Sequence, residues 1–376
     1  MDVSFMGKKV LIIGYCNAYF RREFVRNVVH EQIQYDVLSF EKCDEKYRNL
    51  YNRVYTCASP FKGKIQALMT YILFFIHILT VGHYDIIHIH SIKEIESLYA
   101  PLIRKKCDKL ICTIYGSDYM RVTNKVRQQY KKLFDRADYI TLATKTITQD
   151  FNQYYKNRYL DKIVRLSMAI DTFRVIDQVI QSGSNREELK SLFGIPRDSF
   201  VITVGYNATR EQNHTKIFKQ LMESKEWLPS NYFVVVPMGY GNAAYRERIV
   251  EEFNHSGLNG KCLCEFYDME MIARLRLSSE MMIQLQDTDL ISASMMEYIY
   301  TGNIVVTGAW LNYTELNEYI EEICSIEALS SKLKEIFSDL EQYCTKTRTE
   351  KCKKYLNDNF SWLEVKKKWL MLYGVE

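Results

Sequence analysis

Short apolar runs alternate with helical patterns along almost the whole chain, and this order constrains the fold more than any other feature. In the first half, the runs that predict strands are residues 9–15, 35–40, 85–90, 109–116 and 138–144. The alternation stops near residues 170–181 and restarts with runs at residues 199–206, 232–241, 261–268, 280–286 and 303–308. A repeated strand–helix–strand order predicts parallel, doubly wound sheets. We therefore expect an α/β protein of two Rossmann-like domains, at residues 1–172 and 173–357.

The composition excludes several other classes of protein. The chain is 47% hydrophobic and 26% charged, and its low counts of 15 Gly and 5 Pro exclude collagen-like and linker-like chains. A net charge of +4 is too small to indicate a nucleic-acid binder. The ten cysteines are scattered without a Cys-x-x-Cys pair, so we expect free thiols and a cytoplasmic protein. Cys262 and Cys264 alternate on a predicted strand, but two further ligands are missing nearby, which disfavours a metal site.

One apolar segment, residues 65–82, is nearly long enough to cross a bilayer. It contains polar residues and is followed at once by an apparent strand, so a buried or surface-docked helix is favoured over a span. Lys62 and Lys64 precede it, which makes a helix lying on an anionic membrane a reasonable hypothesis. A second basic and apolar segment, residues 362–372, is also suited to a membrane face.

The strongest functional signal begins where the strand at residues 280–286 ends. Asp289 follows this strand, and a predicted helix then carries Glu297 in its second turn. A helix N-terminus is suited to a phosphate, and a carboxylate close behind it can accept hydrogen bonds from a ribose diol. Alternatively, Glu297 belongs to a capping box and Asp289 is only a solvated loop residue. The residues of the helix start are Ser292, Ala293 and Ser294.

A second group of polar residues follows the strand at residues 199–206. Arg210 offers a forked cation for phosphate oxygens, and Lys216 in the first turn of the next helix can assist. Both can instead be ordinary surface cations. The other ligand-binding candidates at this strand end and the next are Gly205, Asn207, His214, Gly239 and Tyr240.

Several motifs together resemble the GT-B glycosyltransferases. In that family an acidic residue, seven spacers and a Glu precede a Gly and an apolar strand, and Asp289 and Glu297 have this spacing. DIIHIH, residues 85–90, resembles the first-domain strand that ends in paired histidines. TIYGSD resembles the Thr-x-His-Gly segment with Tyr115 in place of the His, and SMAIDTF resembles the turn at the domain junction. Residues 205–214 and VPMGYGNAAYRERI are also similar to bacterial transferases that add acetamido-dideoxygalactose to a lipid-linked carrier.

The resemblance implies a GT-B fold, in which two Rossmann-like domains face each other across a cleft and the C-terminal helix, residues 358–376, packs back on the first domain. It implies a nucleotide-sugar donor held by the second domain, with Tyr267 and Asp268 near the base. Asp289 and Arg210 are implied to take part in catalysis. The acceptor, a saccharide or lipid-linked saccharide, is expected at the first domain, and its implied contacts are His90, Glu94, Tyr115 and Asp118.

The implied activity is sugar transfer in the synthesis of a bacterial surface polysaccharide such as a capsule, without a cofactor or a metal. Asp287 and Asp289 also match the Asp-x-Asp metal motif of GT-A glycosyltransferases, but their late position in the chain disfavours that fold. His90 or Asp118 can act as a general base if configuration inverts, which the similarity to acetamido-dideoxygalactose transferases favours. The acidic-x7-Glu spacing favours retention, toward which we lean slightly. The alternatives are a sugar-nucleotide 2-epimerase of the same fold and a non-catalytic nucleotide-sugar-binding subunit.

Overall fold

The chain divides into two compact units, each of which is described by itself. The computed structural model describes residues 7–166, 168–289, 291–343 and 346–375. The first unit contains Met1–Met168 and Trp362–Glu376, and the second contains Ala169–Ser361. The predicted domain boundaries, at residues 172 and 358, lie close to this division.

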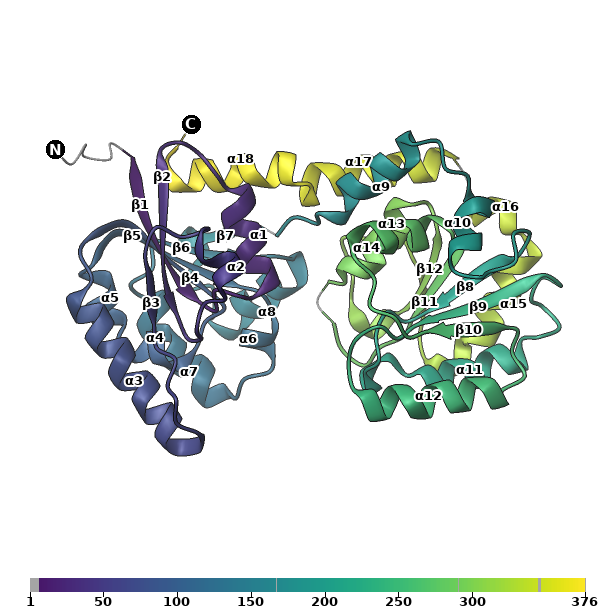
Figure 1. The fold of residues 1–376 in the computed structure, drawn as a ribbon, viewed down its shortest axis with the longest axis horizontal. Helices are drawn as coiled ribbons and strands as arrows, with labels where there is room; N and C mark the ends of the chain where they lie inside the picture. Colours follow the sequence, from purple (N-terminus) through teal and green to yellow (C-terminus); the bar gives the residue numbers. More distant parts are fainter. Residues whose placement is uncertain (1–6, 167, 290, 344–345, 376) are drawn as a thin grey trace. The chain divides into compact units, whose positions relative to one another are not determined.

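The first unit is built on a seven-stranded parallel sheet with the order β3-β2-β1-β4-β5-β6-β7 (Figure 1). Ile12 of β1, an inner strand, pairs with Val37 on one side and His88 on the other. Val10–Ile13 are completely buried, as expected for a parallel strand that helices cover on both faces. The strands are β1 (Lys8–Gly14), β2 (Ile33–Ser39), β3 (Val54–Thr56), β4 (Tyr84–His90), β5 (Cys107–Ile114), β6 (Tyr139–Leu142) and β7 (Ile163–Arg165). The helices are α1 (Tyr19–Asn27), α2 (Glu45–Arg48), α3 (Gly63–Thr80), α4 (Glu94–Leu98), α5 (Ala100–Arg104), α6 (Ser117–Met120), α7 (Asn124–Phe134), α8 (Lys145–Tyr154), η1 (Leu160–Lys162) and α18 (Trp362–Tyr373).

The second unit contains a six-stranded parallel sheet with the order β10-β9-β8-β11-β12-β13 (Figure 1). Its strands are β8 (Phe200–Val204), β9 (Tyr232–Pro237), β10 (Gly260–Leu263), β11 (Met281–Gln284), β12 (Ile304–Gly308) and β13 (Glu321–Ile323). Its longer helices are α9 (Thr172–Gln181), α10 (Arg186–Leu192), α11 (His214–Glu223), α12 (Ala243–His255), α13 (Met269–Leu277), α14 (Ala293–Tyr300), α15 (Leu329–Ser338) and α17 (Lys346–Phe360). Its short helices are η2 (Arg210–Gln212), η3 (Ala309–Leu311), η4 (Asn317–Tyr319), η5 (Ile326–Ala328) and α16 (Leu340–Tyr343).

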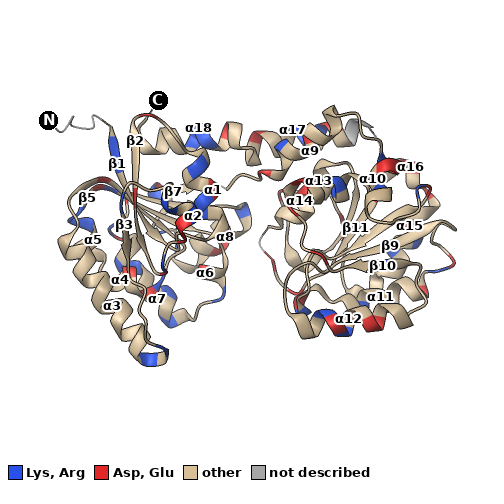
Figure 2. Ribbon diagram, viewed as in Figure 1, with Lys and Arg blue, Asp and Glu red and all other residues tan. Residues whose placement is uncertain are grey.

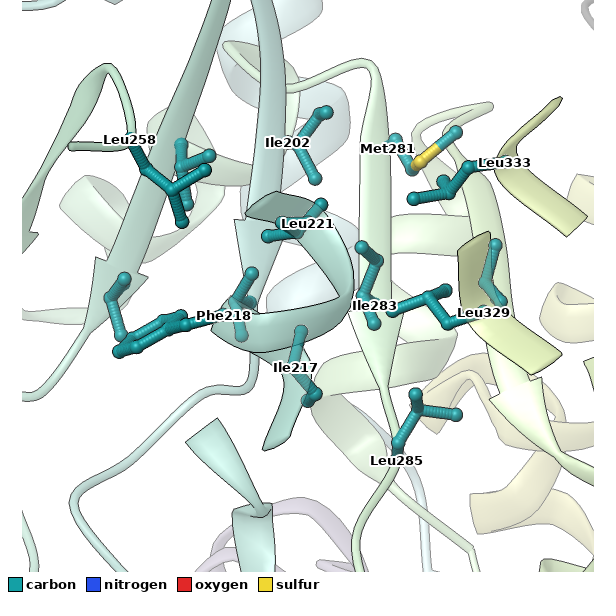
Figure 3. Packing of buried hydrophobic residues seen from close by; sticks show 14 of the residues in the cluster. Ile202, Ile217, Phe218, Leu221, Leu258, Met281, Ile283, Leu285, Leu329 and Leu333 are labelled. Atoms are coloured by element: carbon teal, nitrogen blue, oxygen red, sulfur yellow. The ribbon is translucent and has the colours of Figure 1, made fainter. Parts of the chain in front are cut away.

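The core of the second unit lies on both faces of its sheet. On one face, Ile217 and Leu221 of α11 pack against Ile202 of β8 and Ile283 of β11 (Figure 3). The spacing of four residues places both α11 side chains on one side of the helix. Helices α9, α13 and α14 contribute to a separate buried cluster with Met282 of β11. With both faces covered, the strand ends and the loops that follow them are the parts of this sheet open to a ligand.

The C-terminal helix α18 packs into the first unit, as the resemblance implies. Trp369 and Tyr373 are almost completely buried, and the Trp369 ring meets Phe24 edge-on at 5.0 Å. The Tyr373 hydroxyl lies 2.7 Å from Nδ1 of His88 in the sheet. The idea that residues 362–372 form a membrane face is therefore wrong for Val365 and Trp369, which belong to the core, whereas Leu363 and Met371 are exposed.

Sequence patterns missed the short edge elements. β3, β7 and β13 are each three residues long, too short to show a period of two. The predicted junction at residues 170–181 is largely helix α9. The predicted strand at 261–268 ends at Leu263, so Cys262 and Cys264 do not share one strand face, and Cys264 is exposed.

Candidate active site

The loop that follows β8 forms the centre of the candidate site. Gly205 has a φ of +63°, which favours glycine. A Cβ at this position would lie 2.8 Å from Oε1 of Gln212 and 2.9 Å from Nε2 of His214. The missing side chain therefore lets two buried polar groups approach the backbone at the end of the strand.

In the segments that follow β8 and β11, four buried side chains carry a polar atom that has no partner among the described residues. The atoms are Oδ1 of Asn207, Oε1 of Gln212, Nε2 of His214 and Nε2 of Gln286. A buried polar atom without a hydrogen bond costs about 1–3 kcal/mol, so a ligand or ordered water that bonds to it is stabilising. Asn207 and His214 were predicted here, whereas the two glutamines were missed because no motif distinguishes them from core residues.

Hydrogen bonds fix this loop to its neighbours. Asn213, which has a left-handed conformation, donates from Nδ2 to Leu285 O at 2.9 Å and to Oδ1 of Asp287 at 2.8 Å. The Asp287 amide donates to Glu211 O at 2.9 Å. On the other side, Ala208 N donates to Tyr240 O at 2.7 Å. The loops after β8, β9 and β11 thus form one connected edge.

The two predicted phosphate cations lie on this edge. Arg210 lies in η2 and is exposed, and Lys216 is exposed in the first turn of α11. Neither has an ion pair with a carboxylate among the residues that the structure describes. Both cations are therefore positioned to meet an anion that comes from solution.

The turn after β9 is tightly packed, as its glycines allow. A Cβ on Gly239 would lie 2.3 Å from Glu265 O, and one on Gly241 would lie 2.5 Å from Ala208 O. Tyr240 between them is 50% exposed, so its ring is available at the edge that the loops form. The predicted positions Gly239 and Tyr240 thus belong to the same edge as Gly205.

Helix α14 begins beside this edge, and the alternative in which Glu297 belongs to a capping box is wrong. Ser292 is the cap, since its Oγ accepts a hydrogen bond from Met295 N at 3.1 Å. The Glu297 carboxylate instead accepts from Nε of Arg276 at 3.0 Å, and both side chains are buried. Glu297 lies too far along the helix to reach the backbone of Ser292, because a capping-box acid follows its cap by three residues.

Arg276 organises the first turns of α14, and sequence reasoning missed it. Besides Glu297, it donates to the Tyr298 hydroxyl at 2.9 Å and to Ser294 Oγ at 2.9 Å. A buried ion pair of this kind is favourable only when further hydrogen bonds complete it, which is the case here. The sequence feature that could have indicated Arg276 is an arginine between two leucines of a helical segment, LRLSS.

Asp289 and Asp287 have different partners. The Tyr313 hydroxyl donates to Oδ2 of Asp289 at 2.8 Å and accepts from Gln284 Nε2 at 3.1 Å. Burial, and then the Asp289 carboxylate, raise the pKa of Tyr313 far above its usual range, so Tyr313 remains a donor. Asp287 is bonded to Asn213 instead. Within the described residues, no group of three or more His, Cys, Asp or Glu is arranged to hold a metal ion.

The residues predicted near the nucleotide base have structural contacts. Tyr267 packs edge-on against Phe193 at 5.5 Å, and Asp268 caps α13 by accepting from Met271 N at 2.8 Å. Their neighbour Phe266 is 77% exposed, and its Cα lies 3.2 Å from where a Gly239 Cβ would be. Phe266 is therefore better placed than Tyr267 to contact a nucleotide base. It was missed because the predicted strand extended past it.

The acceptor-side histidine lies in the first unit and has no exposed surface. Nδ1 of His90 lies 2.6 Å from the Tyr115 hydroxyl, and its Nε2 lies 3.1 Å from Nδ1 of His88. Burial, followed by His88, lowers the pKa of His90 well below its usual value. Direct contact between His90 and an acceptor is thus excluded in this conformation, and any influence passes through Tyr115, which is half-buried. Ser167, in the motif SMAIDTF, lies outside the described residues.

Asp118 joins two loops of the first unit. Its carboxylate accepts hydrogen bonds from the amides of Gly116 at 2.7 Å, Tyr115 at 3.1 Å and Ile92 at 3.1 Å. These contacts tie the loop after β5 to the loop after β4, which is a structural role. Glu94, in contrast, is exposed at the start of α4 and lines a groove of about 460 Å³.

The buried histidine of the second unit predicts a pH dependence of stability. Burial lowers the pKa of His214 from 6.5 to about 4. Between these values the unfolded chain binds a proton and the folded chain does not. The free energy of unfolding should therefore be highest above pH 6.5 and fall by up to about 1.4 kcal/mol per pH unit toward pH 4.

Urea unfolding of the protein and of His214→Gln across this pH range measures the contribution of His214. Burial also lowers the pKa of His88 and His90, so these residues contribute to the pH dependence with the same sign. The contribution of His214 is therefore the difference between the two proteins in the slope of the unfolding free energy against pH. We expect a shallower slope for His214→Gln. Equal slopes would show that His214 does not stay neutral in the folded protein.

Comparison with known proteins finds similarity to glycosyltransferases. Residues 9–144 match the model of the family described as glycosyl transferase 4-like. A glycosyltransferase from Rickettsia africae is 17% identical, with 98% of each chain covered and a TM-score of 0.75. HepE from Anabaena in complex with UDP and glucose is 13% identical, with 98% of this chain and 99% of that chain covered and a TM-score of 0.70. Sucrose-phosphate synthase from Thermosynechococcus elongatus is 11% identical, with 98% of each chain covered and a TM-score of 0.72.

No curated protein sequence shows significant similarity to the chain. At these low identities the solved structures show the fold, and the predicted GT-B fold is confirmed. The family match over residues 9–144 agrees with the predicted resemblance to glycosyltransferases of this fold.

Proposed function

We propose that the protein transfers a sugar from a nucleotide-sugar donor, bound at the carboxyl edge of the second sheet, to a saccharide or lipid-linked saccharide. The observation that carries this proposal is the set of buried polar atoms beside Gly205, next to the exposed Arg210, for which the part of the chain that the structure describes offers no partner. A diphosphate offers several acceptor oxygens and negative charge, which suits an arginine and the N-terminus of α14. HepE binds UDP and UDP-glucose, which supports a uridine nucleotide as the first donor to test.

The proposed chemistry breaks the bond between the anomeric carbon and the diphosphate and forms a bond to an acceptor oxygen. Negative charge then develops on the departing diphosphate. Arg210 and Lys216 stabilise that charge without a metal, and fixed donors of this kind contribute most when they are in place before the reaction. Tyr313 orients Asp289, which we assign to the hydroxyl groups of the donor sugar.

Retention of configuration is the outcome that we propose. An inverting transfer needs a general base that reaches the acceptor proton. His90 has no exposed surface, and the Asp118 carboxylate is occupied by three backbone amides. Neither is well placed as that base, whereas a retaining transfer can release the proton to the departing diphosphate.

We assign the protein to the cytoplasm and to the synthesis of a bacterial surface polysaccharide. The cysteines that the structure describes are free, which agrees with a reducing compartment. Nucleotide sugars are soluble anions, so a cytoplasmic enzyme can draw on them directly. The polysaccharide role comes from the similarity of residues 205–214 to transferases that act on lipid-linked carriers.

Thermal shift with a panel of UDP-, GDP- and dTDP-sugars, with and without EDTA, tests the donor site. We expect saturable stabilisation by one nucleotide class that EDTA does not abolish. Absence of a shift with every donor would contradict the proposal. Incubation with that donor alone, followed by product analysis, then separates a transferase from an epimerase, since only an epimerase changes the sugar without an acceptor.

Phe266 is expected to stack on the nucleotide base. Replacing it with alanine should weaken nucleotide binding about tenfold, since stacking of a base on an aromatic ring contributes about 1–3 kcal/mol. Isothermal titration with the free nucleoside diphosphate measures the effect. Phe61→Ala is the matched control, because Phe61 is also an exposed phenylalanine but lies in the first unit. Equal affinities of the two variants would place the base elsewhere.

A further inference from the structure

Helix α3 of the first unit is apolar on the side that the protein does not cover. Six large apolar side chains of this helix are 38–61% exposed. They are Ile65, Leu68, Ile72, Phe75, Ile76 and Leu79. Among the described residues, α3 is the one helix that is long and apolar enough to cross a membrane. Only 11% of this segment is buried, whereas a core helix of the same composition would be mostly buried. An exposed apolar face of this extent normally marks a contact with a partner or a membrane.

The inner side of α3 is held by the first unit. Phe74 is completely buried and stacks on Phe40 at 5.7 Å, and His77 Nε2 lies 3.0 Å from Thr56 O. The helix also connects β3 and β4, two parallel strands of one sheet, so it must run back along that sheet. These contacts fit a helix that lies in a membrane surface rather than one that spans the bilayer.

The charges around α3 match an anionic surface. Between Glu45 and Asp85 the sequence contains no Asp or Glu. The same segment contains Lys46, Arg48, Arg53, Lys62 and Lys64. Lys62 and Lys64 are exposed where α3 begins, and the basic residues are visible at that end of the helix in Figure 2. Each Lys or Arg near an anionic membrane contributes about a fivefold gain in affinity, from about 1 kcal/mol.

A groove joins this helix to the carboxyl edge of the first sheet. One wall is the inner side of α3, at Ala67 and Thr70, and the other includes Tyr15 and Phe40, which follow β1 and β2. The ammonium group of Lys93 lies 3.6 Å from the centre of the Tyr15 ring. The groove thus combines aromatic surface with a cation, next to the helix with the apolar outer face.

We propose that the outer face of α3 docks the protein on an anionic membrane surface. The helix lies parallel to the bilayer, with its six apolar side chains among the acyl chains and Lys62 and Lys64 at the headgroups. The groove then opens beside the headgroup region, where the head of an amphiphilic acceptor is located. Only this last point, entry of the acceptor, depends on the proposed function.

Flotation with vesicles tests the docking with the full chain. Vesicles of phosphatidylcholine alone are compared with vesicles that also contain phosphatidylglycerol. We expect the protein to float with the anionic vesicles and the double variant Leu68→Glu/Ile72→Glu to lose at least tenfold in binding. Lys62→Glu/Lys64→Glu should lose the preference for anionic lipid. The control Leu363→Glu/Met371→Glu changes two exposed apolar residues of α18 and should bind as the unmodified protein does.

Two results would overturn the docking proposal. One is failure of the unmodified protein to bind anionic vesicles, and the other is equal binding by Leu68→Glu/Ile72→Glu. A concentration-dependent dimer that this variant abolishes, without vesicle binding, would assign the face to a second copy of the chain and also refute the proposal. Nucleotide binding by the same variant is measured in parallel and should be unchanged, so that failure of the donor site is distinguished from failure of membrane docking.

Discussion

Replacing Arg210 with alanine is expected to lower kcat/KM about 10²–10³-fold, the loss typical of removing one fixed donor to a developing negative charge. The side chain is exposed and has no ion pair with a carboxylate among the described residues. Its loss should therefore change the free energy of unfolding by less than about 0.5 kcal/mol. The measurement is turnover of the nucleotide sugar that the thermal-shift panel selects, together with urea unfolding of each variant.

Two further variants make this result specific to the guanidinium group. Lys219→Ala removes an exposed cation from α11 that pairs with Glu223, away from the strand end, and should leave turnover unchanged. Arg210→Lys keeps the positive charge but not the planar guanidinium group that can bind two phosphate oxygens at once, so it should recover only part of the activity. An Arg210→Ala protein with unchanged turnover would show that the donor phosphate does not lie against this loop.

Replacing Arg276 with methionine is expected to lower the free energy of unfolding of the second unit by about 3–5 kcal/mol, because a buried carboxylate loses its partner. Arg276 also holds Tyr298 and Ser294, so helix α14 should lose order at its N-terminal end. Nucleotide affinity should fall as well, since this end of the helix faces the proposed phosphate. Urea unfolding and hydrogen exchange of the α14 amides measure the two effects.

The double variant Arg276→Met/Glu297→Leu separates the unpaired charge from the loss of packing. Removing both charges should recover much of the stability, as replacement of buried ion pairs by apolar residues often does. It should not recover nucleotide binding if Glu297 contacts the ribose. A loss below about 1 kcal/mol for Arg276→Met would contradict the burial of this ion pair.

The sequence was sufficient for the architecture because a parallel sheet leaves a strong pattern. Runs such as Val10–Ile13 are apolar throughout, and the helical periods between them leave little choice of fold. The edge strands β3, β7 and β13 could not be predicted, because three residues carry no period and their pairing depends on neighbours far away in the sequence.

The predicted site residues follow the ends of the strands, as expected from the sequence, but the partners of individual side chains were not predicted. Glu297 was found from its spacing, yet its ion pair with Arg276 joins two helices and leaves no trace in local sequence. His90 ends its strand as expected, although the packing of Tyr115 and Phe24 against it removes it from the surface. Burial and pairing across elements therefore decide which predicted residues are available to a ligand.

A crystal structure of the protein with a bound nucleoside diphosphate tests the central claim most directly. We predict that the diphosphate lies at the carboxyl edge of the second sheet, within hydrogen-bond distance of Arg210 and of the amide groups at Ser292–Ser294. We also expect new hydrogen bonds from the ligand to Oδ1 of Asn207 or Nε2 of His214. A diphosphate bound elsewhere, with Arg210 pointing into solvent, would contradict the proposed donor site.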